Sequence, residues 1–264
     1  MKTLLVVALL GALLMPSTLM AQSAFDGTWK VDLDKVHPPK KPDVLVLKNG
    51  MFECRTCVPP IDIKADGQDQ KVVGNPYFDT MAVKVVDDHT IERTEKKDGK
   101  VVLTAQTTVA ADSKTASFEF TDNTSSNGAT VTGKGRMIRV AKGPYGSHAM
   151  SGSWRTASYG GVSDNGLSFT YKVDGDKVSM TTPTGQSYEA SFSGADAPYM
   201  GDPGTSSISV KKLGKNVIQE TAMRDGKVIS VSKLMVAADG KTMDIAVTDT
   251  LHRTTMSFVA DRQQ

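Results

Sequence analysis

The sequence lacks the features that mark several large classes of protein. It has two cysteines, no block of like charges, and no apolar run near the ~20 residues of a membrane-spanning helix. Its 31 Lys and Arg against 29 Asp and Glu leave a formal net charge of +2. A balance so close to neutral gives no long-range attraction to nucleic acid or anionic lipid. We therefore expect no nucleic-acid partner and no stable membrane insertion.

Familiar catalytic motifs are absent as well. There is no Gly-x-Ser-x-Gly elbow, no phosphate-binding glycine loop ahead of a helix, and no His-Glu-x-x-His. The four histidines are scattered and have no carboxylates at metal-ligand spacing, which favours surface histidine over a metal site: His37, His89, His148 and His252. We predict no cofactor, no metal and no catalytic residue. Enzymatic activity stays open, because function resides in sites that need not follow known motifs.

The N-terminus has the layout of a secretory signal peptide. Lys2 supplies a positive charge, Leu4 to Met15 form a short apolar run, and Pro16 breaks it ahead of a small residue, Ala21. We predict a signal peptide over residues 1–21 and a periplasmic or secreted mature protein. Cleavage after Ala24 is the alternative, because Leu19 is large for the position that it occupies before the Ala21 site.

Export would determine the oxidation state of the two cysteines. Cys54 and Cys57 form a Cys-x-x-Cys pair, and an oxidising compartment favours a disulfide between them. A redox centre is the first alternative, although redox pairs of this kind open a helix beside a βαβ unit, whereas this pair precedes β-like sequence. Half of a metal site is the second alternative. We predict a structural disulfide.

The chain contains an internal duplication. Residues 25–30 match residues 150–155 at an offset of 125, and each segment holds one of the two tryptophans. Residues 67–122 match residues 194–249 at an offset of 127, with about a third of positions identical. A period of this length suits two whole domains. We predict domain 1 over residues 22–141, a linker over 142–149 and domain 2 over 150–264.

Each repeat has the pattern of hairpin-linked β-strands. The second repeat shows alternating or β-branched segments at 167–173, 177–180, 188–192, 208–212, 217–223, 228–235, 243–247 and 254–259. Asp-Gly pairs between them favour tight hairpins. No window beyond the signal peptide has sustained helical periodicity. We predict an all-β protein of two tandem antiparallel up-and-down β-barrels, each around its own core, with a β-sandwich as the competing architecture.

Two turn regions carry more detailed expectations. Residues 67–79 and 194–206 repeat the same Asp, Gly and Pro positions, which favours a shared structural loop over a functional one. Asp112-Ser113 stands where the second repeat has Asp239-Gly240, so we expect the two hairpins to use different turns.

Two motifs carry a family resemblance. Gly27-Thr28-Trp29 and Gly152-Ser153-Trp154 resemble the Gly-x-Trp signature of the first lipocalin strand, and the remaining Gly-x-Pro and Asp-Gly-Lys-Val pieces look like exported bacterial lipocalin-like proteins. The resemblance implies a lipocalin-like barrel in which Trp29 and Trp154 plug the closed end, often against an arginine of the last strand. Candidate arginines are Arg139 in the first repeat and Arg253 or Arg262 in the second. It also implies binding of small apolar molecules.

The predicted function follows from a barrel interior. We expect a binding protein for a small apolar or amphipathic molecule, because a closed meander can exclude water from a ligand. Methionine suits an adaptable lining, with ordinary core packing as the alternative, and the candidates are Met180, Met223, Met235 and Met243. Tyr77, Phe78 and Tyr199 are candidates for the rim. A non-catalytic structural or interaction module, and a thiol-disulfide protein using Cys54 and Cys57, are the competing functions.

Overall fold

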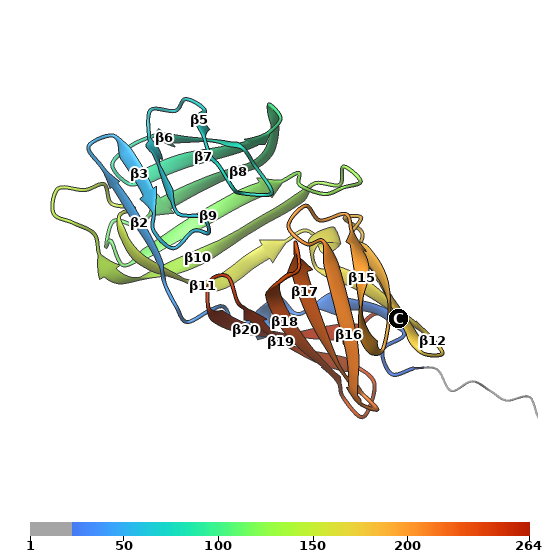
Figure 1. Cartoon of the computed structure of the whole chain (residues 1–264). Coiled ribbons are helices and arrows are strands. Elements are labelled where there is room, and N and C mark those ends of the chain that lie inside the picture. Colours follow the sequence, from blue (N-terminus) through green and yellow to red (C-terminus); the bar gives the residue numbers. More distant parts are fainter. Residues whose placement is uncertain (1–22) are drawn as a thin grey trace, which may run out of the picture.

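The computed structural model describes residues 23–264, so the predicted signal peptide over 1–21 lies outside the described residues. Apart from two short 3-10 helices, η1 (Leu33–Lys35) and η2 (Asp164–Gly166), the regular structure consists of antiparallel strands in two ten-stranded sheets (Figure 1). In this part of the chain no helix is long and apolar enough to cross a membrane. The prediction of an all-β protein with two antiparallel barrels is confirmed.

Barrel 1 is formed by strands from the middle of the chain. They are β2 (Asp43–Lys48), β3 (Met51–Cys54), β4 (Ile61–Lys64), β5 (Gln70–Lys71), β6 (Thr80–Val85), β7 (Thr90–Lys97), β8 (Lys100–Val109), β9 (Thr115–Asp122), β10 (Val131–Lys142) and β11 (Gly152–Val162). The sheet order is β4-β3-β2-β11-β10-β9-β8-β7-β6-β5. Its two edge strands, β4 and β5, follow one another in the chain.

Barrel 2 is a closed barrel that combines the two ends of the described chain. Its strands are β1 (Gly27–Val31), β12 (Ser168–Asp174), β13 (Lys177–Thr181), β14 (Ser187–Ser191), β15 (Ser193–Met200), β16 (Ser207–Gly214), β17 (Val217–Arg224), β18 (Lys227–Val236), β19 (Thr242–Asp249) and β20 (Thr254–Arg262). The hydrogen-bonded order is β1-β12-β13-β14-β15-β16-β17-β18-β19-β20, closed between β20 and β1.

The hairpins form where the sequence analysis placed Asp-Gly pairs. Asp98 and Gly99 have φ of 49° and 76°, and Asp225 and Gly226 have φ of 52° and 74°. Two consecutive residues with positive φ give the turn whose twist matches that of the flanking strands. Each pair therefore joins neighbouring strands directly, β7 to β8 in barrel 1 and β17 to β18 in barrel 2.

The first strand of each repeat lies in the barrel formed by the other repeat. Strand β1 pairs with β12 and β20, whereas β11 pairs with β10 and β2. In Figure 1 the blue β1 accordingly lies among the orange and red strands of the lower barrel. The expectation that each repeat wraps around its own core is therefore wrong. The predicted linker at 142–149 separates the repeats, but the chain passes between the barrels at residues 32–42 and 163–167.

The reason for the exchange is local. Strand β10 ends at Lys142, and β11 begins at Gly152, directly opposite it in the antiparallel register. A strand pair joined by a short connection forms with little loop-closure entropy, so β11 stays beside β10. The place beside β12 and β20 is then filled by β1, which carries an equivalent sequence.

The closed end of each barrel holds one tryptophan. Trp29 and Trp154 are both fully buried. The Nε1 of Trp29 donates a hydrogen bond to the Phe25 carbonyl oxygen at 3.0 Å, and that of Trp154 donates to the Met150 carbonyl oxygen at 2.8 Å. Each indole nitrogen is thus satisfied within its own segment, which allows the ring to be buried without an unpaired donor.

An arginine from the last strand of each repeat, β10 or β20, covers the tryptophan ring. The Arg139 guanidinium lies 4.0 Å from the centre of the Trp154 ring, and that of Arg262 lies 4.2 Å from the Trp29 ring, both within cation–π range. Arg139 and Arg262 are therefore the plug arginines, and Arg253 is not, because it lies in the turn before β20. Owing to the strand exchange, each arginine meets the tryptophan of the opposite repeat.

The glycine of each Gly-x-Trp motif is required by this arginine. Gly27 has φ of 120° and Gly152 has φ of 136°, values that side chains with a Cβ rarely adopt. A Cβ atom at either glycine would lie 2.8 Å from Nη1 of the stacked arginine. The motif therefore combines an unusual backbone conformation with close approach of the guanidinium.

Two turn predictions need correction. Residues 194–200 of the expected second loop lie in strand β15, which begins at Ser193, and residues 70–71 of the first form β5. Ser113 has φ of 55° and Gly240 has φ of 70°, and their amides donate to the Ala110 and Ala237 carbonyls at 2.8 and 2.9 Å. The two hairpins thus share one turn geometry, because each must present a carbonyl oxygen to the plug arginine.

The ends of the barrels opposite the tryptophan plugs face one another. The rim loop after β9 reaches barrel 2, where Asn127 Nδ2 donates to the Pro183 carbonyl oxygen at 2.8 Å. Lys41, in the first crossover, donates to the His252 carbonyl oxygen at 2.7 Å. Asn165, in the second crossover, donates to the Thr130 carbonyl oxygen at 2.8 Å. These contacts hold the two mouths together around a common space.

Candidate functional site

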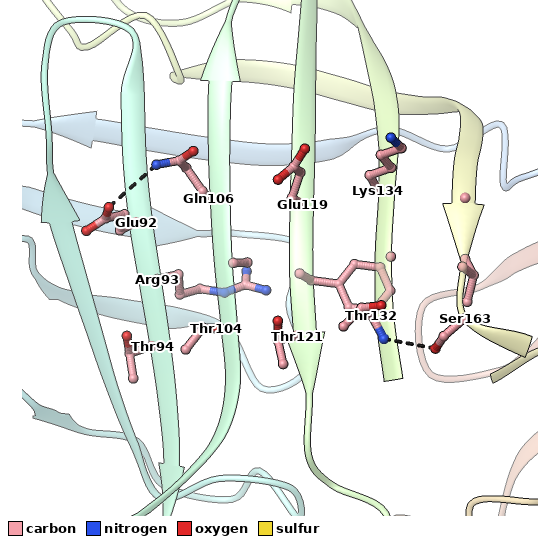
Figure 2. Close-up of a pocket in the computed structure, with 15 residues that line it drawn as sticks. Glu92, Arg93, Thr94, Thr104, Gln106, Glu119, Thr121, Thr132, Lys134 and Ser163 are labelled. Carbon is pink, nitrogen blue, oxygen red and sulfur yellow. Dashed lines mark hydrogen bonds between the residues drawn. The ribbon is translucent and has the colours of Figure 1, made fainter. Parts of the chain in front are cut away.

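The outer face of barrel 1 carries a broad polar hollow of about 750 Å³. Figure 2 shows Glu92, Gln106, Glu119 and Lys134 in one row across β7 to β10, with a second row of four threonines beside it: Thr94, Thr104, Thr121 and Thr132. Glu92 already has partners, with Lys84 at 3.1 Å and Gln106 at 3.5 Å. Paired charges and hydroxyls on an open sheet face are typical of a solvated surface.

The interior of barrel 1 contains an apolar cavity of about 440 Å³. Its apolar walls come from seven strands and from the segment just before β11, and comprise Leu45, Phe52, Ile91, Leu103, Phe118, Phe120, Met137, Met150 and Trp154. Sites for small molecules are typically 300–1,000 Å³ and mostly apolar. The cavity thus has the volume and the lining of a small-molecule site.

Small residues on the inward face keep this cavity open. Ala105 lines it directly, and a Cβ atom at Gly135 would lie 2.5 Å from the Phe118 ring. A Cβ at Gly133 would likewise collide with the Phe120 ring. The two glycines therefore let both aromatic rings lie against the wall formed by β10, where they line the cavity and leave its centre free.

The cavity opens toward a second hollow between the two mouths. This junction chamber has a volume of about 490 Å³, and Cys57, Arg93 and His252 line both spaces. Barrel 1 contributes Tyr77 and Met81 among others, and barrel 2 contributes residues near the open ends of β17 to β20: Arg224, Ile229, Ser230, Val247, Asp249, Thr254 and Met256. A molecule in barrel 1 would reach the chamber past Arg93.

A charged pair lies where the cavity meets the chamber. Ile91, Arg93 and Glu95 alternate with outward residues on β7 and so point into barrel 1. The Arg93 Nε lies 3.1 Å from Glu95 Oε1, yet in the described part of the chain this buried Nε has no hydrogen-bond partner. The distance is that of an ion pair, but the N–H group is poorly aligned with the carboxylate, and hydrogen bonds weaken steeply with angle.

The carboxyl group of Glu95 is held in a poorly hydrated place. Burial raises its pKa above the ordinary value, Asp122 raises the pKa further, and the positive charge of Arg93 opposes both effects. Asp43 and Asp122 also line the apolar cavity. Arg93 is the one arginine or lysine among the residues that line the cavity, whereas two aspartates line it and Glu95 contacts Arg93.

The predicted disulfide is confirmed and lies in the cavity wall. Cys54 and Cys57 are bonded. Cys54 is buried in the core of barrel 1, and Cys57 lines both the cavity and the chamber. The bond ties the end of β3 to the loop that follows it, so it fixes part of the mouth.

Barrel 2 fills the equivalent interior positions with a polar cluster. Tyr171 and Tyr188 both donate hydrogen bonds to Glu220 Oε1, the first at 2.5 Å. In the strand registers these three residues correspond to Leu45, Ile61 and Arg93 of barrel 1. Burial raises the pKa of Glu220, opposed by the two tyrosine hydrogen bonds. Burial and the nearby Glu220 raise the pKa of both tyrosines.

The buried Glu220 makes the stability of barrel 2 depend on pH. A folded pKa above the unfolded value means that the native state binds its proton more tightly, so this contribution to stability is present at low pH and is lost as pH rises through the folded pKa. We expect Glu220→Gln, which keeps an acceptor for the tyrosines, to flatten this decline. Urea unfolding of both proteins between pH 5 and pH 8 should show wild type losing stability relative to the variant. Parallel pH profiles would contradict the assignment.

The aromatic residues predicted for the rim have different locations. Tyr77 lines the junction chamber, and burial together with Asp202 raises its pKa. Phe78 also borders the chamber but is buried in the core of barrel 1. Tyr199 packs inside barrel 2, with its ring centre 6.0 Å from that of Tyr188. Two of the three therefore border the space between the mouths.

The predicted methionines are not gathered in the cavity. Met180 and Met243 belong to the core of barrel 2, and Met223 is buried in the same barrel. Met235 is 44% exposed, and its side chain lies on the outside. The methionines that do line the cavity are Met137 and Met150. Methionine content alone could not distinguish an open barrel from a packed one.

Sequence reasoning missed Arg93 and Glu95, although a signal was present. Alternation places Ile91, Arg93 and Glu95 on one face of a single strand, which puts charge on a face that begins with isoleucine. The aligned position in the second repeat, Glu220, is also charged and has the opposite sign. Charges at matching inward positions of two repeats indicate that the interiors differ in chemistry.

Comparisons with known proteins give no family for this chain. No family model, no curated protein and no solved structure matches it. The resemblance to lipocalins therefore rests on the two Gly-x-Trp motifs and stays a prediction.

Proposed function

We propose that this protein binds one small amphipathic molecule in barrel 1, with the apolar part of the molecule inside the barrel and its polar end at the junction chamber. The observation that carries the proposal is the 440 Å³ apolar cavity whose opening is marked by Arg93. Transfer of an apolar chain from water into such a space is favourable in proportion to the apolar area buried.

Differences between the barrels favour barrel 1 as the binding barrel. Large aromatic side chains and Glu220 occupy the middle of barrel 2, where barrel 1 has leucine, isoleucine and an arginine. The sheet of barrel 1 also ends in two edge strands, β4 and β5, whereas the sheet of barrel 2 is closed. One barrel thus serves as the binding site, and the other supports it.

We further propose that the protein is an exported, lipocalin-like protein. The signal-peptide layout and the Cys54–Cys57 disulfide support export. The tryptophan and arginine at each closed end support the resemblance to lipocalins. Cleavage after Ala21 is favoured over cleavage after Ala24, because the Ala24 carbonyl oxygen accepts a hydrogen bond from Arg262 Nη2 at 2.6 Å.

The test is a binding measurement with a variant that fills the cavity. Ala105→Trp places an indole inside barrel 1, whereas Thr104→Trp places it on the outer face of the same strand. We expect the mature protein to bind a dansyl-labelled fatty acid, Thr104→Trp to bind it equally, and Ala105→Trp to lose at least about 10-fold in affinity, a change of about 1.4 kcal/mol. Native mass spectrometry should show one bound molecule per chain.

Two outcomes would contradict the proposed function. Absence of probe binding by the wild-type protein is the first. The second is equal binding by Ala105→Trp and wild type, which would place the probe outside barrel 1. A protein that binds no amphiphile in any assay would fit the alternative of a structural module with packed barrels.

A further inference from the structure

We propose that the polar end of the ligand is a single carboxylate and that Arg93 binds it. This inference rests on the proposed function and names the class of ligand: a long-chain monocarboxylic acid. Arg93 is the residue that both hollows share and that can pair with an anion. Figure 2 shows its side chain extending from β7 across the neighbouring strand β8.

The hydrogen-bonding state of Arg93 is the first argument. Its side chain is 38% exposed, and its Nε is buried without a hydrogen-bond partner among residues 23–264. A guanidinium has five N–H donors in one plane, and a carboxylate accepts two of them in parallel. Buried donors in native proteins almost always have partners, and this Nε has only the poorly aligned Glu95 Oε1 at 3.1 Å, so the guanidinium is free to turn its N–H groups toward a carboxylate supplied from outside the chain.

The charges around Arg93 limit the anion to one negative charge. Glu95, Asp43 and Asp122 line the cavity or the chamber beside it, and Arg93 is the one arginine or lysine in the cavity lining. A carboxylate would be neutralised by this guanidinium. The second charge of a phosphate monoester would face the acidic side chains, and the cavity lining holds no second arginine or lysine to balance it, since Arg224 lines only the chamber and belongs to barrel 2. The site therefore favours a carboxylate over a phosphate.

The apolar walls determine the direction of the ligand. From Arg93 the cavity runs inward past Phe118 and Met137 to Trp154, the plug at the closed end. An acyl chain would lie along these side chains, and its carboxylate would remain at the mouth. In this arrangement no polar group of the ligand is buried without a partner, because the carboxylate pairs with Arg93. A neutral alcohol at the same place would pair with the guanidinium less strongly.

Glu95 has an opposing role in this arrangement. Its Oε1 lies 3.1 Å from Arg93 Nε, so it competes with the ligand for the guanidinium. The substitution Glu95→Gln would remove that competition and leave the shape of the mouth unchanged. Substitutions of Arg93 and of Glu95 should therefore change the affinity for the same ligand in opposite directions. The two variants are independent tests.

The experiment compares three amphiphiles with the same chain: decanoate, decanol and decylamine, each titrated by displacement of the dansyl probe at neutral pH. Wild type should bind decanoate roughly 10- to 100-fold more tightly than decanol, the range for charge-assisted hydrogen bonds. Arg93→Met should bind both alike, with decanol affinity unchanged. Glu95→Gln should bind decanoate more tightly than wild type does and decanol equally.

A matched variant controls for the loss of a positive charge elsewhere. Arg136 is exposed on the outer face of β10, so Arg136→Met removes the same charge outside the cavity. It should leave the binding of decanoate and decanol unchanged. Decanol binding by Arg93→Met reports that this variant is folded. If that variant does not fold, Glu95→Gln decides the question alone.

The outcomes separate the two proposals. If wild type binds neither decanoate nor decanol, the proposed function fails and this inference fails with it. If decanol binds as tightly as decanoate, or decylamine binds more tightly than both, amphiphile binding stands but the carboxylate assignment is overturned. Unchanged decanoate affinity in both Arg93→Met and Glu95→Gln would also overturn it.

Discussion

Trp29→Ala is expected to destabilise the barrel built from the second repeat and to leave the barrel of its own repeat intact. Trp29 is fully buried and packs in the core of barrel 2 together with Phe25 and Tyr171. Truncation of a buried tryptophan costs about 3–5 kcal/mol. The cost should fall on barrel 2, because the strand that carries Trp29 pairs with β12 and β20.

Hydrogen exchange measured by mass spectrometry can locate this loss. In Trp29→Ala the amides of β12 to β20 should exchange faster, and those of β2 to β10 should keep their wild-type protection. Trp154→Ala is the matched variant and should give the reverse pattern, since Trp154 packs in barrel 1. If each substitution loosened the strands of its own repeat, the strand exchange would be wrong.

Gly152→Ala should destabilise the protein by about 3–5 kcal/mol, from backbone strain together with overpacking. Gly152 has φ of 136°, and a Cβ atom there would collide with the Ala141 carbonyl oxygen and lie 2.8 Å from Arg139 Nη1 and 3.1 Å from the Gly143 nitrogen. The substitution would therefore displace the guanidinium that stacks on Trp154. Urea unfolding monitored by tryptophan fluorescence measures the change.

Gly99→Ala is the control for an alanine at positive φ without any close contact. Gly99 also has positive φ, 76°, but nothing lies within 4 Å of a Cβ placed there. It should lose only about 1 kcal/mol, the strain of a left-handed residue. If Gly152→Ala lost no more than Gly99→Ala, neither the φ of 136° nor the close approach of the Ala141 oxygen and the Arg139 guanidinium would have energetic importance.

On the proposed function, the duplication separates a binding barrel from a supporting barrel. The plug is the same in both, down to the carbonyl oxygens of Ser113 and Gly240 that accept from the arginines. The centres differ, since Arg93 in one barrel stands where Glu220 stands in the other. The carboxyl group of Glu220 accepts hydrogen bonds from two tyrosines. The buried Nε of Arg93, in contrast, has no hydrogen-bond partner among residues 23–264 and lies beside an apolar space.

Much of the fold was predictable because its signals are local. Alternation along strands such as β12 and β19, and turns such as Asp225-Gly226, depend on neighbouring residues only. The Gly-x-Trp motifs indicated the plugs and their arginines in advance. The site was predicted less well, because the sequence does not show whether a methionine such as Met180 or Met243 lines a cavity or fills a core.

The sequence by itself determined the strands, the hairpins, the duplication and the disulfide pair, because each is specified by residues close together in the chain. Only the tertiary structure decided which barrel each first strand joins, because β1 and β11 carry equivalent sequences and their hydrogen bonds form with strands far away in the chain. It also decided that the interior of barrel 1 is hollow. That outcome depends on how Gly133, Gly135 and Ala105 pack against rings from other strands, which alternation within one strand does not reveal.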